Sequence, residues 1–66
     1  MRLTVNGEPR EIQDGIILAE FLAQYELKAQ MVVVEHNGFI VKRDIFESTL
    51  LKEADTLEIV QMMAGG

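Results

Sequence analysis

The sequence has 66 residues, no cysteine and a net charge of −5, from eleven acidic and six basic side chains. A chain of this length makes one small domain whose apolar residues are needed for the core, so we expect no deep catalytic pocket. The missing cysteine excludes disulfides, thiolate metal sites and a cysteine nucleophile. The acidic balance argues against nucleic-acid binding, which needs a basic surface.

The sequence carries no sign of export or of membrane insertion. Residues 1–7 hold one arginine with no apolar stretch behind it, unlike a signal peptide. No apolar run approaches the length of a transmembrane helix. Together with the absence of cysteine, this favours a cytoplasmic protein with no membrane partner.

The chain opens with a predicted β-hairpin. Apolar and polar residues alternate over residues 1–5, as on a half-buried strand. Asn6-Gly7 is a turn pair typical of hairpins, and residues 8–12 return as a second strand. Pro9 has no N–H to donate to a neighbour, so we expect this second strand at an edge of the sheet.

One amphipathic helix is predicted over residues 17–25. Leu18, Phe21, Leu22 and Tyr25 follow the spacing of a single helical stripe. We expect this stripe to pack on the sheet, because a lone hairpin is not stable without such a helix.

A second hairpin follows the helix. Residues 31–34 are apolar on both faces, so this strand is either central or meets a partner on one face. Asn37-Gly38 is again a hairpin turn, and residues 39–41 form a short strand. The last strand is predicted over residues 57–62 and is expected to pair beside the first.

The segment between the second hairpin and the last strand, residues 42–52, is predicted to be irregular, with a short helical turn near residues 44–47. Phe46, Leu50 and Leu51 are expected to anchor this segment to the core. The predicted order of strands and helix describes an α+β roll, with a mixed four- to five-stranded sheet and one main helix across it.

The two faces of the last strand have different expected roles. Leu57 and Ile59 are expected to face the helix, which turns Val60 and Met62 outward, with Val33 or Met31 beside them. An exposed apolar patch on a small acidic domain usually marks a partner site. The alternative is that these are ordinary scattered surface residues.

The sequence stops at Ala64-Gly65-Gly66. Two glycines give a thin chain end whose only chemistry is the backbone carboxylate, and such an end can enter a channel too narrow for a side chain. We expect a domain over residues 1–62 and a flexible tail over residues 63–66. The alternative is a frayed end without a role.

We expect structural roles for the isolated polar residues. His36 is the only histidine and no second ligand is close in pattern, so we expect it to face solvent or to be hydrogen bonded, and we predict no metal site. Asp14, Asp44 and Asp55 are typical of turns and caps.

The whole pattern resembles the ubiquitin-like β-grasp fold, and within it the sulfur carrier family of thiamin biosynthesis, the ThiS family. The resemblance covers essentially the whole chain. Its parts are Asn6-Gly7-Glu8, Leu18 with Leu22, Asn37-Gly38, Val41 with Arg43, and residues 55–60 leading to Ala64-Gly65-Gly66. Ala54 and Phe46 depart from the family, which often has glycine and tryptophan there.

The resemblance implies a function for the tail. An activating enzyme of the ubiquitin-activating type would use ATP to adenylate Gly66, and a persulfide donor protein would convert it to a thiocarboxylate that supplies sulfur to thiazole synthase. Gly65, Ala64, Met63, Met62 and Val60 would contact these partners. The chain would then be a co-substrate with no bound cofactor, not an enzyme.

Two other functions remain open from the sequence. The related small subunit of molybdopterin synthase, or a carrier for tRNA thiolation, shares the fold and the Gly-Gly end. The former usually has a longer middle, for which 66 residues leave little room. A β-grasp interaction module with an incidental Gly-Gly end is the alternative of another class.

Overall fold

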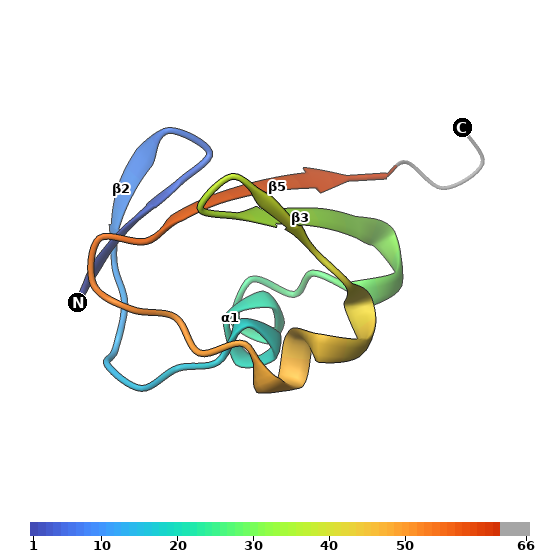
Figure 1. Ribbon diagram of the computed structural model, residues 1–66, viewed down its shortest axis with the longest axis horizontal. Helices are drawn as coiled ribbons and strands as arrows, with labels where there is room; N and C mark the ends of the chain where they lie inside the picture. Colours follow the sequence, from blue (N-terminus) through green and yellow to red (C-terminus); the bar gives the residue numbers. More distant parts are fainter. Residues whose placement is uncertain (63–66) are drawn as a thin grey trace.

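A computed structural model of the chain describes residues 1–62. Figure 1 shows the sheet on one side and the single α-helix on the other. The elements in chain order are β1 (Arg2–Val5), β2 (Glu8–Glu11), α1 (Leu18–Gln24), η1 (Ala29–Met31), β3 (Val32–His36), β4 (Phe39–Val41), η2 (Arg43–Ser48) and β5 (Thr56–Gln61). The two η segments are 3₁₀ helices; η2 covers the predicted helical turn, whereas η1 was not predicted.

The five strands form one mixed sheet in the order β2-β1-β5-β3-β4. β5 is parallel to β1 and antiparallel to β3, so the prediction that the last strand pairs beside the first is confirmed. β2, which contains Pro9, is an edge strand as expected. The valine-rich β3 lies inside the sheet, between β5 and β4. This is the β-grasp arrangement that the sequence predicts.

Both hairpin turns adopt the conformation that their sequences predict. Asn6 and Gly7 have φ angles of 51° and 82°, and Asn37 and Gly38 have 52° and 88°. Two successive positive φ angles characterise the two-residue turn that matches the twist of paired strands. Asparagine and glycine adopt these angles at little steric cost, so each turn sets the register of its hairpin.

The core lies between α1 and the inner face of the sheet. Buried apolar side chains come from every layer and are Leu3, Val5, Ile12, Ile16, Leu18, Phe21, Leu22, Val32, Val34, Phe46, Leu51 and Leu57. The apolar stripe of α1 is therefore core, as predicted, except at its end. The helix stops at Gln24, and Tyr25 is the C-cap residue, exposed beyond the packed turns.

One predicted core anchor is wrong. Phe46 and Leu51 are buried, but the side chain of Leu50 is 48% exposed. Leu50 forms an isolated bridge with Ile17, and the Leu51 N–H donates to the Ile16 carbonyl, so the segment is extended here. Neighbouring residues of an extended segment point to opposite sides, and only one of the two leucines can face the core. Within residues 1–62, no helix has the length and apolar character needed to cross a membrane.

Candidate functional site

The outer face of the sheet, opposite α1, carries a patch of exposed apolar side chains on β3, β4 and β5. Val33 and Val60 lie directly opposite each other on paired strands and are 40% and 62% exposed. Met62, two residues further along, is 42% exposed, and Ile40 is 69% exposed. We call Val33, Ile40, Val60 and Met62 the docking face. The prediction that Val60 and Met62 face outward beside Val33 is confirmed, and Leu57 and Ile59 face inward, as expected.

An acidic pair borders the docking face. Glu35 and Glu58 are opposite each other in the register of β3 and β5, and Ile40 is opposite Glu35 on β4. Like charges in directly opposed positions destabilise a sheet. Among residues 1–62, no basic side chain forms an ion pair with either glutamate. This face therefore combines apolar surface with uncompensated negative charge, which suits a partner that presents apolar and basic side chains.

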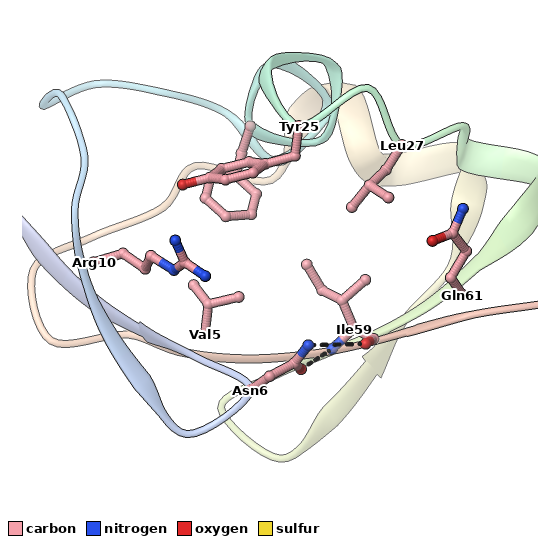
Figure 2. A pocket seen from close by; sticks show the side chains of 8 residues that line it. Val5, Asn6, Arg10, Tyr25, Leu27, Ile59 and Gln61 are labelled. Atoms are coloured by element: carbon pink, nitrogen blue, oxygen red, sulfur yellow. Dashed lines mark hydrogen bonds between the residues drawn. The ribbon is translucent and has the colours of Figure 1, made fainter.

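The strand that carries the docking face is held in register on both sides. Towards β1, the Asn6 side chain accepts a hydrogen bond from the Ile59 N–H (2.7 Å) and donates one to the Ile59 carbonyl (3.2 Å). This amide takes the place of a neighbouring strand just after β1 turns away (Figure 2). Towards β3, the Met62 N–H donates to the Met31 carbonyl at 2.6 Å. The path of the chain is thus fixed as far as Met62.

The start of β5 is fixed by a buried carboxylate. Asp55 accepts hydrogen bonds from His36 Nε2 (2.7 Å), the Asn37 side chain (3.0 Å) and the Lys52 N–H (2.8 Å). The Asn37 side chain in turn accepts from the Thr56 N–H at 2.8 Å. Asp55 is thus a turn residue, as predicted, and His36 is hydrogen bonded. The Asp55–His36 contact joins the end of β3 to the residue just before β5, and the Asn37–Thr56 hydrogen bond joins the β3–β4 turn to the first residue of β5.

The same contacts decide the charge of Asp55. Burial alone would raise its pKa, because a carboxylate loses solvation in the interior. The hydrogen bonds from His36, Asn37 and the Lys52 backbone favour the charged form and outweigh burial, so the pKa of Asp55 lies below its ordinary value. The carboxylate is therefore charged at neutral pH and keeps all three hydrogen bonds.

Most of the predicted site residues lie at the end of the chain. Met63, Ala64, Gly65 and Gly66 are outside the described residues. Met62 is the last described residue, and it belongs to the docking face. In Figure 1, β5 runs along the sheet to the end farthest from Met1.

Ile40, Glu35 and Glu58 are not among the site residues predicted from the sequence. The position of Ile40 could be predicted from the Asn37-Gly38 turn, because a two-residue turn places Ile40 opposite Glu35. The pairing of Glu35 with Glu58 needed the register of β3 on β5, which joins segments 23 residues apart. In the part of the chain that the structure describes, no cluster of three or more metal-ligating side chains occurs.

Comparison with known proteins agrees with this geometry. The model of the ThiS family matches residues 3–66. The crystal structure of the thiamine biosynthesis protein ThiS from Geobacter metallireducens superposes with a TM-score of 0.83, at 36% identity, over 100% of both chains. The sulfur carrier protein ThiS of Bacillus subtilis is 33% identical over 65 residues, which cover 97% of this chain and 98% of that protein.

A further relative is a much longer protein. The thiazole synthase of Magnetococcus marinus is 32% identical over 66 residues, which are 100% of this chain and 20% of that protein. The chain thus spans about a fifth of the thiazole synthase it matches. The match to the family model covers nearly the whole sequence, and the Geobacter metallireducens protein shares the fold over its full length at 36% identity. The chain belongs to the ThiS family.

Proposed function

We propose that the protein is a sulfur carrier of thiamin biosynthesis and that Gly66 carries the sulfur. The observation that supports this most is the continuity of β5 with the end of the chain. β5 is anchored on both sides, bears the exposed Val60 and Met62, and leads directly into residues 63–66. A partner that binds the docking face is then next to the chain end on which it acts.

The chemistry follows from the weakness of a carboxylate as an electrophile. An activating enzyme joins the Gly66 carboxylate to AMP, with release of pyrophosphate from ATP, and so supplies a good leaving group. A persulfide on a donor protein attacks the carbonyl carbon and releases AMP. A partner thiol then cleaves the sulfur–sulfur bond, which leaves a thiocarboxylate on Gly66 and a disulfide on the partner. Transfer of this sulfur to the thiazole precursor breaks the carbon–sulfur bond at Gly66, and an oxygen atom from the precursor or from water forms the new carbon–oxygen bond that restores the carboxylate.

In this scheme the protein is a co-substrate and the partners supply the catalytic groups. The sequence has no cysteine that could capture the activated carbonyl of its own chain. Its glycines at positions 65 and 66 leave the carbonyl sterically accessible. ATP is bound by the activating enzyme, and this chain holds no cofactor.

Thiazole synthase is proposed as the partner that consumes the sulfur. The support is the thiazole synthase of Magnetococcus marinus, which includes a segment similar to this whole chain. A carrier and an acceptor present in one polypeptide act at high effective concentration, which fits successive steps of one reaction. Glu35 and Glu58 are opposite each other beside the docking face, and this negative charge favours partners that present basic side chains there.

Intact-protein mass spectrometry tests this proposal. After incubation with the cognate activating enzyme, ATP and a persulfide donor, we expect the mass gain of one oxygen-to-sulfur exchange, located by fragmentation at Gly66. A variant that lacks Gly66 should fold normally and gain no sulfur. The proposal fails if the full-length chain remains unmodified while a known carrier is converted in the same mixture, or if sulfur is found on another residue.

A further inference from the structure

The backbone of β5 offers a free edge near its end. Hydrogen bonding along a strand alternates between its two neighbours. The Met62 N–H donates to the Met31 carbonyl at 2.6 Å, and Val60, two residues earlier, directs its N–H and carbonyl towards β3 in the same way. The backbone N–H and carbonyl groups of Ile59 and Gln61 therefore point in the opposite direction, towards the β1 side of the sheet.

On that side, β1 ends before it reaches Gln61. β1 pairs with β5 only as far as Val5 and Leu57. The Asn6 N–H then donates to the Leu57 carbonyl (2.8 Å), and the Asn6 side chain satisfies Ile59. Because the chain turns back at this point, no strand in residues 1–62 pairs with Gln61 there. Within the described part of the chain, the N–H and carbonyl of Gln61 therefore form an unpaired sheet edge.

A hollow of about 260 Å³ lies against this edge, on the α1 side of the sheet. Figure 2 shows Ile59 below the hollow, with Tyr25 and Leu27 above and Arg10 and Gln61 at its two ends. The side chain of Phe21 contributes further apolar lining. The hollow is therefore the place where the side chains of a strand continuing the line of β1 would pack.

Among residues 1–62, the one charged side chain that lines the hollow is the cation Arg10, although the protein as a whole has a net charge of −5. The Arg10 guanidinium lies 5.7 Å from the centre of the Tyr25 ring, which holds it at the rim. No acidic residue lines the hollow. Arg10 has one ion-pair partner, Glu8, at 3.4 Å, and both side chains are solvent accessible, so this pair is weak. An acidic side chain of a partner would find a positioned cation here.

We propose that an extended segment of a partner protein adds to the free edge of β5. Its backbone pairs with Gln61, and the apolar side chain of the residue opposite Gln61 fills the hollow. The residue two positions nearer the β1–β2 hairpin displaces the Asn6 amide from beside Ile59, and its acidic side chain binds Arg10. Alternate side chains of a strand share one face, which gives this two-residue spacing. This site lies on the α1 side of β5, whereas the docking face lies on the outer face of the sheet. One partner can therefore contact β5 on both faces. The inference does not depend on sulfur carriage.

A peptide titration followed by NMR tests this on the full chain. The probe is a threonine peptide with capped ends that contains one leucine and one glutamate two positions apart. In the control peptide, lysine replaces the glutamate. We expect the glutamate peptide to shift Gln61 and Leu27 signals and to slow amide exchange of Gln61 about tenfold, since this N–H gains a hydrogen bond. Val60, already bonded to β3, should keep its exchange rate.

Charge reversal gives the matched comparison. Arg10→Glu should weaken the glutamate peptide about tenfold and favour the lysine peptide. Arg2→Glu changes the same charge on the same hairpin, but Arg2 pairs with Glu11 away from the hollow, so it should leave binding unchanged. The proposal is overturned if neither peptide binds, if both bind equally, or if the shifts map to the docking face. It is also overturned if Gln61 is already protected by self-association in a concentration series without peptide.

Discussion

Replacing Ala54 with glycine should stabilise the protein. Ala54 has a φ of +72° in the turn before β5. A residue with a Cβ loses about 1–2 kcal/mol in this left-handed conformation. Glycine removes that strain but adds about 0.4–1 kcal/mol of chain entropy to the unfolded state. The midpoints of these two ranges differ by about 0.8 kcal/mol, which is the expected net gain.

The surroundings of Ala54 add little else to the free-energy change of this substitution. Its side chain is exposed, so glycine loses little buried surface. The Ala54 N–H donates to the Arg2 carbonyl at 2.8 Å, and glycine retains that bond. Because the substitution relieves only backbone strain, the rest of the fold should be unchanged.

Thermal and urea unfolding measure the effect. For a domain of this size, 1 kcal/mol corresponds to a shift in Tm of about 4–8 °C. Ala23→Gly is the matched control, since Ala23 is exposed inside α1 and glycine there should destabilise by about 1 kcal/mol. If Ala54→Gly is neutral or destabilising while the control behaves as expected, the assignment of strain to this turn is wrong.

Three further predictions concern the docking face and the buried carboxylate. Val60→Asp should slow ATP-dependent activation of the chain about tenfold without unfolding it. Ile45→Asp, at another exposed apolar residue, on η2, should leave the rate unchanged, and equal losses would contradict the assigned face. Glu58→Gln should raise the free energy of unfolding by about 0.2–1 kcal/mol, since it removes the repulsion from Glu35, and the gain in urea unfolding should shrink at high salt. Because the pKa of Asp55 is lowered on folding, its stabilisation is present above the unfolded pKa of about 4 and is lost as the pH falls through the folded pKa. Asp55→Asn should therefore lower stability at pH 7 and flatten its pH dependence below about pH 4; an unchanged acid limb would refute this.

Local sequence signals predicted most of the fold. The two Asn-Gly turns and the alternating strands gave both hairpins, and the apolar stripe gave the position of α1 to within its last turn. Leu50 was misplaced because residues 42–52 have no clear period, so the sequence did not indicate which of two adjacent leucines faces inward. Tyr25 fits the helical stripe, but the helix ends before it, where its ring packs on Phe21 at 4.9 Å between centroids.

The candidate site was predicted in part. The alternation of side chains along a strand was enough to predict that Val60 and Met62 face outward. The contact of His36 with Asp55 joins residues 19 positions apart, and the Asn6 clamp on Ile59 joins residues 53 positions apart. Neither contact has a local pattern, because both depend on how the hairpins meet in the sheet. The hollow beside Gln61 could not be foreseen for the same reason.

The position of β5 has a consequence for the order of events during synthesis. β1 and β3 are both neighbours of β5 and do not pair with each other. Until residues 56–61 leave the ribosome, the nascent chain holds two separate hairpins and a core that lacks Leu57, which is fully buried in the finished domain. Pairings between distant segments form late in folding. A truncated or stalled chain therefore cannot present a finished domain, and the activating enzyme proposed above would meet residues 63–66 only on domains whose sheet has closed.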